Sequence, residues 1–172
     1  MTLRHAQGER GETVWQGRYI EARRDGRWEW AARARGIGAA VILATDDDGR
    51  VLLVEQYRVP LGARTIELPA GLVGDEETGE AVEASALREL EEETGWRAQR
   101  VERLGRFASS PGMVSETFEL VRAVGLRETG ADPEDGIVVH RIASADLPDF
   151  LAARRAEGLI VDVKLLALLS FV

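Results

Sequence analysis

Nine of the 30 acidic residues of the chain lie in one short segment, Asp75–Glu93, which contains a single base, Arg88. Glu89, Glu92 and Glu93 recur there at spacings of three and four residues. On a helix, which advances about 100° per residue, these carboxylates share an arc of about 100°. Like charges at this spacing repel each other, and hard divalent cations prefer carboxylate oxygens. We therefore interpret the arc as a ligand set for Mg²⁺, with Mn²⁺ as a possible substitute.

An acidic run on a helix is more commonly a solvated face than a metal site. Glu91 fits that simpler interpretation, because it points away from the other three carboxylates. Two features favour a site. The preceding segment Pro69–Glu80 is rich in glycine, which lets the backbone approach a ligand closely. Arg88 is also placed to pair with an acid one or two turns earlier.

The acidic arc requires a helix, which we expect to start near Gly79 and to stop at Gly95. Glu93 lies beside the apolar stripe of this helix, so the arc borders its buried side. The stripe consists of residues at helical spacing: Val82, Ala86, Leu87 and Leu90.

The rest of the chain reads as mostly β, with hairpin signals at Asp25-Gly26 and at Gly49. We expect two helices at the end, Ala145–Glu157 and Val161–Phe171. This order favours a mixed α/β sandwich over a regular βαβ winding. The predicted strands are Val14–Arg23, Trp28–Arg33, Ile37–Ala44, Arg50–Tyr57, Thr65–Leu68, Arg100–Ala108, Thr117–Val124 and Ile137–Ile142.

The composition excludes several classes of chemistry. Without cysteine there is no disulfide, thiolate nucleophile or iron–sulfur cluster, and two histidines and one lysine, Lys164, leave little for a histidine-rich centre or a Schiff base. The net charge of −8 comes entirely from the acidic segment. Because no basic patch is clustered, we expect no nucleic-acid partner. No apolar stretch suits a membrane span or a signal peptide, so we expect no membrane partner and a cytoplasmic location.

Residues 74–96 resemble the Nudix box, GX5EX7REUXEEXGU. The matching positions are Gly74, Glu80, Arg88, Glu89, Leu90, Glu92, Glu93 and Gly95, and Trp96 replaces the final aliphatic residue. The flanking segments "VLLVEQYRVPLGARTIELPAG", "SSPGMVSE" and "EDGIVVHRI" are similar to ADP-ribose pyrophosphatases of this superfamily. In the related pattern "ELPAG", Gly71 takes the place of the first glycine. That alignment implies a three-residue insertion before Glu80 and leaves Glu77 as an alternative helper acid.

The resemblance implies a Nudix-type α/β/α sandwich with a mixed β-sheet over residues 36–172. It also implies an N-terminal antiparallel β-hairpin region over residues 1–35 that forms a homodimer. The implied activity is Mg²⁺-dependent hydrolysis of a nucleoside diphosphate linked to another group X, foremost ADP-ribose to AMP and ribose 5-phosphate. A nucleotide-sugar pyrophosphatase and a non-catalytic, nucleotide-binding regulatory domain are the alternatives. The glutamates of the box favour an enzyme, since non-catalytic relatives usually lose them.

The resemblance also implies roles for individual residues. The carbonyl of Ala70 would join Glu89, Glu92 and Glu93 on the metal, with Glu92 and Glu93 counted as catalytic. Gly71, Gly74 and Gly95 would shape the motif, and Arg88 would pair with Glu80.

For the substrate, the resemblance implies that Arg58 contacts the diphosphate, whereas Glu67 and Glu116 bind riboses or organise the metal. Trp28 would stack on adenine, reaching it from a partner subunit. The general base would be Glu134 in the loop "GADPEDG", with Asp135 as the alternative.

Overall fold

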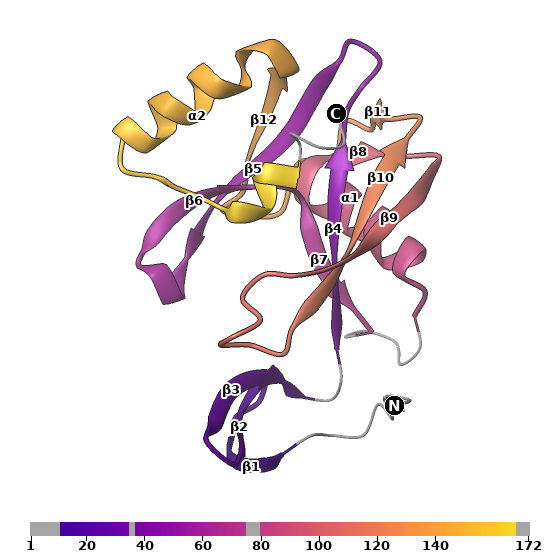
Figure 1. Ribbon diagram of the computed structural model, residues 1–172. Coiled ribbons are helices and arrows are strands. Elements are labelled where there is room, and N and C mark those ends of the chain that lie inside the picture. Colours follow the sequence, from indigo (N-terminus) through magenta and orange to yellow (C-terminus); the bar gives the residue numbers. More distant parts are fainter. Residues whose placement is uncertain (1–10, 35–36, 75–79, 168–172) are drawn as a thin grey trace, which may run out of the picture.

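The computed structural model of the protein describes residues 11–34, 37–74 and 80–167. It begins with an antiparallel sheet of three strands, β1 (Glu12–Gln16), β2 (Ile20–Asp25) and β3 (Trp28–Arg33), which lies to one side of the remaining chain (Figure 1). The hairpin predicted at Gly26 is present. The predicted single strand Val14–Arg23 is wrong, because the chain turns where the Gly17 N–H donates to the Ile20 carbonyl at 2.8 Å.

Two four-stranded mixed sheets form the body of the fold. The first has the order β7-β4-β10-β9, with β10 parallel to β4, and the second has the order β12-β5-β6-β13, with β13 parallel to β6. The bounds of the first are β4 (Gly38–Ala44), β7 (Ala70–Val73), β9 (Arg100–Ala108) and β10 (Thr117–Val124). Those of the second are β5 (Arg50–Arg58), β6 (Ala63–Glu67), β12 (Val138–Ala143) and β13 (Ile160–Val161). A short pair, β8 (Trp96–Arg97) and β11 (Arg127–Glu128), completes the strands of the described residues.

The central helix is α1 (Val82–Thr94), and it ends where the sequence predicts. Gly95 adopts a left-handed φ of 71° and donates its N–H to the Glu91 carbonyl at 2.8 Å. Glycine adopts this conformation with little strain, because it has no β-carbon. The predicted start at Gly79 lies outside the described residues.

The C-terminal region contains α2 (Leu147–Ala156), as predicted, preceded by the 3₁₀ turn η3 (Ser144–Asp146). The predicted final helix, Val161–Phe171, is wrong over its described part. Strand β13 extends to Val161, and a 3₁₀ turn, η4 (Val163–Ala167), follows it. Residues 168–172 lie outside the described part. A third 3₁₀ turn, η2 (Val59–Leu61), joins β5 to β6, so β5 ends just before Pro60, as predicted.

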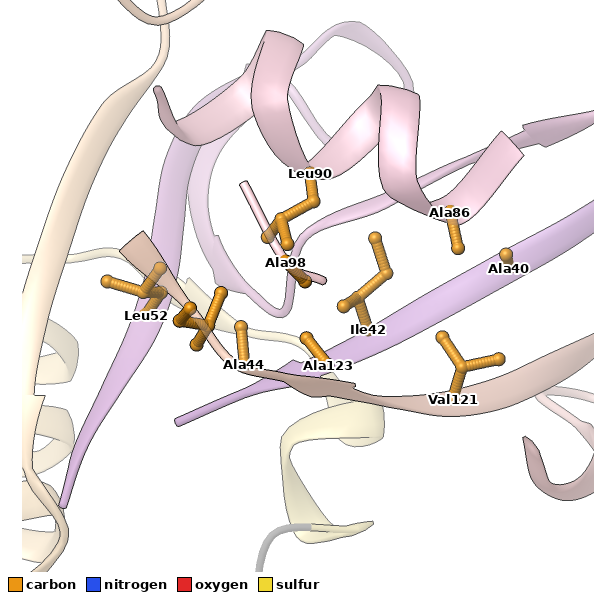
Figure 2. Close-up of a cluster of buried hydrophobic side chains, with 10 residues drawn as sticks. Ala40, Ile42, Ala44, Leu52, Ala86, Leu90, Ala98, Val121 and Ala123 are labelled. Carbon is orange, nitrogen blue, oxygen red and sulfur yellow. The ribbon is translucent and has the colours of Figure 1, made fainter. Parts of the chain in front are cut away.

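Strand β4 alternates between two hydrophobic cores. Ala40, Ile42 and Ala44 point toward α1, and Ala86 and Leu90 of the helix point back at them (Figure 2). All five are fully buried. The predicted apolar stripe is therefore the packed face of α1, and this packing fixes which carboxylates of the helix face β7.

The other face of β4, with Val41 and Leu43, packs in a second core against the second sheet. Leu147 of α2 and Leu165 of η4 close this core from outside. Helical layers thus cover both sides of the strands, which confirms the predicted α/β/α arrangement. In the described part of the chain, no helix is both long enough and apolar enough to span a membrane.

Strand β7 was not expected, because Pro69 and Gly71 suggest a loop. It pairs antiparallel with β4, and the Ile42 N–H donates to the Pro69 carbonyl at 2.9 Å. The motif "PAG" therefore forms the edge of a sheet that lies directly beneath α1.

Candidate active site

Glu93 is a buried carboxylate at the contact between α1 and β7. Its side chain accepts a hydrogen bond from the backbone N–H of Ala70 at 2.9 Å, and only 6% of the residue is exposed. Burial, opposed by this hydrogen bond and reinforced by the neighbouring charge of Glu89, raises the pKa of Glu93 to about 7. A carboxylate held in this way binds a proton or a cation far more readily than an exposed one.

Glu89 lies one helical turn before Glu93 and packs against the backbone of Gly71. A β-carbon added to Gly71 would lie 2.0 Å from both Cγ and Cδ of Glu89. Only glycine admits this approach, because every other residue carries a β-carbon. The glycine of "ELPAG" is therefore required for this close approach of Glu89 to β7.

Arg88 ties the acidic face together. Its guanidinium lies 3.0 Å from Glu89, 2.9 Å from Glu92 and 3.7 Å from Glu80. The expected pairing with Glu80 is therefore present but is the longest of the three. Glu92 is half exposed at its side chain, whereas Glu91 turns away to bind Arg97 at 2.7 Å.

Across residues 11–34, 37–74 and 80–167, no three acidic or histidine side chains are gathered as a ready set of metal ligands. The chemistry of the donors at this corner nevertheless fits a divalent cation. Glu89 and Glu93 are both largely shielded from solvent, and the charge of Glu89 contributes to the raised pKa of Glu93. A cation that binds hard oxygen ligands would relieve the repulsion between these two charges.

Gly74 follows β7 and is the second glycine of interest. It adopts a left-handed φ of 84°, and its N–H donates to a carboxylate oxygen of Glu80 at 3.4 Å. Glu80 thus links the end of β7 to the residues just before α1. The alternative helper acid, Glu77, lies outside the described residues.

A pocket of about 260 Å³ is lined by Ala70 and Gly71 and by other residues of both large sheets, together with Arg33 of β3 and Lys164 of η4. It contains three cations, two carboxylates and one aromatic ring. Its lining is Arg33, Ala39, Val41, Arg58, Glu67, Ala70, Gly71, Leu72, Ser109, Glu116, Phe118 and Lys164. Three residues predicted to bind substrate, Arg58, Glu67 and Glu116, are therefore brought together here from separate parts of the chain.

Arg58 and Glu67 form a two-pronged ion pair across β5 and β6. Arg58 Nε and Nη2 donate to the two Glu67 oxygens at 2.7 and 2.8 Å, and the Thr65 hydroxyl donates to Glu67 Oε1 at 2.5 Å. Burial alone would raise the pKa of Glu67, but these hydrogen bonds hold it below the usual value. Glu67 therefore stays ionised and keeps the guanidinium in one orientation.

Arg33 and Lys164 are pocket residues that the sequence did not single out. Arg33 closes β3 and donates to Glu116 at 2.6 Å, a contact between residues 83 positions apart. Lys164 enters from η4, in a run that reads as apolar. No local spacing signals either residue, because each reaches the pocket only through the packing of separate strands.

Glu134 belongs to a loop that is attached to the end of α1. Its backbone N–H donates to the Glu92 carbonyl at 2.8 Å, and the Thr129 hydroxyl donates to the Gly95 carbonyl at 2.8 Å. The side chains of Glu134 and Asp135 are exposed. The predicted loop is therefore held close to the backbone that carries the acidic residues.

Trp28 stands apart from this site. It is 60% exposed on β3, and it is not among the residues that line the pocket. The guanidinium of Arg27 lies 6.0 Å from the centre of its ring.

A family model described as the NUDIX domain matches residues 34–159 of the chain. The chain belongs to the Nudix family. The match contains the acidic helix, every strand of the two large sheets except β13, and most of the pocket lining.

Relatives place this Nudix hydrolase near the ADP-ribose pyrophosphatases. The chain is 44% identical over 86 residues to the ADP-ribose pyrophosphatase of Bacillus subtilis. This match covers 50% of this chain and 45% of that relative. It is 37% identical over 154 residues to the methanol dehydrogenase activator of Bacillus methanolicus, covering 84% of this chain and 82% of the relative. A crystal structure of an ADP compounds hydrolase shares the fold, with a TM-score of 0.63 and 24% identity, covering 82% of this chain and 80% of that one.

Proposed function

We propose that the protein hydrolyses the pyrophosphate bond of a nucleoside diphosphate linked to another group X, foremost ADP-ribose to AMP and ribose 5-phosphate. The proposal depends mainly on one observation about strand β7. Its first residue, Ala70, donates its N–H to the buried carboxylate of Glu93, and Ala70 and Gly71 also line the pocket that holds three cationic side chains. A diphosphate bound in that pocket would place its phosphorus atoms beside the carboxylates of α1.

The pocket side chains suit the parts of such a substrate. Arg58 keeps unused N–H groups for phosphate oxygens, since Glu67 occupies only part of its fork of donors. Glu67 and Glu116 would offer carboxylate oxygens to ribose hydroxyls, and each is held in place by an arginine.

The residues that would hold a divalent cation are Glu89, Glu92 and Glu93 with the carbonyl of Ala70. Mg²⁺ bound there, or Mn²⁺ in its place, would supply charge neutralisation of phosphate oxygens and a more acidic water. Arg88 already contacts Glu89 and Glu92 and would hold these side chains in position while the substrate exchanges.

The proton of the attacking water needs an acceptor, and we assign that role to Glu134, with Asp135 as the alternative. The water oxygen bonds to one phosphorus, the bond from that phosphorus to the bridging oxygen breaks, and the carboxylate takes the proton. The anchoring of the loop to the Glu92 carbonyl supports this assignment, because it keeps Glu134 near the acidic helix.

We also propose that residues 1–35 form a dimerisation region and residues 36–172 the catalytic domain. The exposed aromatic residues Trp15, Tyr19 and Trp28 of the N-terminal sheet support a homodimer, as does the distance of Trp28 from the pocket of its own chain. Trp28 would then stack on the adenine bound by the other subunit. A protein that runs as a monomer in analytical ultracentrifugation at micromolar concentration would contradict this arrangement.

The deciding experiment for the activity is a panel of diphosphate-linked nucleosides, including ADP-ribose and nucleotide sugars. Each is incubated with Mg²⁺, and the products are separated chromatographically. We expect AMP and ribose 5-phosphate from ADP-ribose, and neither product from the Glu93→Gln protein. Preferred cleavage of a nucleotide sugar would select the nucleotide-sugar pyrophosphatase, and no cleavage of any compound would refute the activity.

A regulatory role is the second candidate, favoured by the long match to a protein named as an activator of a methanol dehydrogenase. Its test adds the protein to a methanol dehydrogenase and compares its effect with that of the Glu93→Gln protein. Activation that survives this substitution would indicate regulation by binding alone. Activation that disappears would tie the effect to hydrolysis.

A further inference from the structure

Lys164 is the only lysine of the chain and one of three cations that line the pocket. The two arginines of the pocket are each bound to a carboxylate that lines it as well, Arg33 to Glu116 and Arg58 to Glu67. Lys164 differs, because its partner, Asp162, is not part of the lining. The ammonium group is therefore held by a carboxylate that is not itself part of the pocket lining.

The backbone of Lys164 is fixed by a short chain of hydrogen bonds. The Asp162 N–H donates to the Ile66 carbonyl at 3.0 Å, which attaches this segment to β6 beside Glu67. The Asp162 carboxylate then accepts the N–H of Lys164 at 2.8 Å. Leu165, 3% exposed, anchors the next residue in the second core. In Figure 1 the yellow end of the described chain lies between the two larger sheets.

The side chain of Lys164 is also held in place by Asp162. Its ammonium group pairs with Asp162, and only 21% of the Lys164 side chain is exposed. An ammonium group has three N–H donors, so pairing with one carboxylate leaves donors for a ligand. Because little water surrounds the group, its attraction to an anion is weakly screened.

Lys164 joins the pocket from the side of β6, because the hydrogen bond between Asp162 and Ile66 attaches its segment to that strand. Arg58 and Glu67 line the same pocket and are paired with each other. A diphosphate bound there by Arg58 would therefore also be attracted by the ammonium group of Lys164.

We propose that Lys164 binds an anionic oxygen of the substrate's diphosphate from the β6 side of the pocket, and so favours nucleosides that carry a diphosphate over those that do not. This inference rests on the proposed function, since it assigns a further substrate contact to the same site. It makes Lys164 a specificity-determining residue, positioned by Asp162.

The competing interpretation is that the Lys164–Asp162 pair only stabilises the C-terminal segment. A stabilising pair would affect adenosine and ADP equally, whereas a phosphate contact affects ADP alone. The two interpretations therefore differ in a ratio of affinities rather than in stability.

The experiment measures binding of ADP and of adenosine by isothermal titration calorimetry, in a chelator so that no turnover occurs. We expect Lys164→Met to weaken ADP binding about tenfold or more and to leave adenosine binding unchanged. Lys164→Arg should retain most of the preference for ADP, because it keeps the charge. Arg100→Gln is the matched control, since it removes an exposed cation of β9 that lies outside the pocket.

A second variant removes the concern that Asp162 is left without its cation. The double substitution Asp162→Asn with Lys164→Met keeps the net charge and removes both partners, and it should lose the preference for ADP as well. The inference is overturned if Lys164→Met and Arg100→Gln change the ADP-to-adenosine ratio equally, or if the unaltered protein shows no preference for ADP.

Failure of the inference and failure of the proposed activity remain distinguishable. Hydrolysis of ADP-ribose with an unchanged ADP-to-adenosine ratio in Lys164→Met would refute the lysine contact alone. A lost preference in Lys164→Met, combined with no hydrolysis of any diphosphate-linked nucleoside, would refute the activity and support the contact.

Discussion

Gly71 and Glu89 lie so close together that a β-carbon on Gly71 would fall 2.0 Å from two carbons of the glutamate. Gly71 is on the edge strand β7, and Glu89 is on the helix that packs over it. The same strand also holds Glu93 through the Ala70 N–H. The side chain of Glu89 can therefore lie this close to the backbone of β7 only because residue 71 is a glycine.

Replacing this glycine should damage the site more than the fold. In Gly71→Ala the new methyl group must displace Glu89, so we expect a loss of activity of at least about tenfold, from misplacement of a positioned group. The measurement is kcat/KM on the best substrate, together with the thermal midpoint. Gly38→Ala, on neighbouring β4, is the matched control, because its nearest side-chain atom is 3.7 Å away. Equal activity of the two variants would contradict the role of Gly71.

The assignment of Glu93 as a metal ligand predicts a large and specific loss. Glu93→Gln should lower kcat/KM by about a hundredfold or more, because several kcal/mol of transition-state stabilisation depend on the cation. A chelator should stop the reaction of the unaltered protein, and added Mg²⁺ should restore it. Circular dichroism of Glu93→Gln should match the parent protein. Activity that is insensitive to chelation would refute the assignment.

The raised pKa of Glu93 predicts how stability depends on pH without metal. The group titrates near pH 4.5 when unfolded and near pH 7 when folded. The unfolded chain therefore loses this proton first as pH rises. The contribution of Glu93 to the free energy of unfolding therefore falls by about 3 kcal/mol as the pH rises from 4.5 to 7, and it stays constant above pH 7.

Urea denaturation at several pH values, in a chelator, measures this effect. Glu93→Gln carries no titratable group at this position, so the difference in stability between the two proteins isolates the glutamate. We expect Glu93→Gln to gain stability relative to the parent as pH rises from 5 to 8. A constant difference across that range would contradict a raised pKa.

The assignment of the general base separates two neighbouring acids. Glu134→Gln should lower kcat by about 10²- to 10⁴-fold, with little change in the Mg²⁺ concentration required. Asp135→Asn is the matched control in the same exposed loop and should retain near-normal kcat. The reverse outcome would assign the base to Asp135, and unchanged kcat in both variants would exclude this loop from proton transfer.

The role of Arg58 can be tested against a second arginine–glutamate pair on the same two strands. Arg58 bonds to Glu67 and Arg64 bonds to Glu55 across the same two strands, but only the first pair lines the pocket. We expect Arg58→Gln to lower kcat/KM by about 10- to 100-fold, the loss of a charge-assisted contact. Arg64→Gln should have a small effect. Similar losses in both would indicate a general defect of the hairpin.

The acidic helix illustrates what local sequence determines. The periodicity of Ala86 and Leu90, and the glycine at position 95, correctly predict the helix, its buried stripe and its end. They also predict that Glu93 borders the core, because helical spacing alone places it beside that stripe. Glu91 is likewise correctly separated from the other glutamates.

Local sequence patterns did not predict the strands that form through contacts between distant segments. Strand β7 was hidden by its glycine and by the proline before it, because its pairing with β4 supplies hydrogen bonds that propensity does not reveal. The same holds for β13, a parallel strand added to β6, whose second residue, Val161, was expected to begin a helix.

By itself, the sequence determined the identity and spacing of the carboxylates on α1, since helical geometry converts spacing into a shared face. The tertiary structure decided how buried each carboxylate is, and with it the raised pKa of Glu93, because burial depends on packing against β7. It also decided that Arg33 and Lys164 join Arg58 in one pocket. Residues from β3, β5 and η4 meet only when two sheets and a C-terminal turn pack together, and no pattern within one segment carries that information.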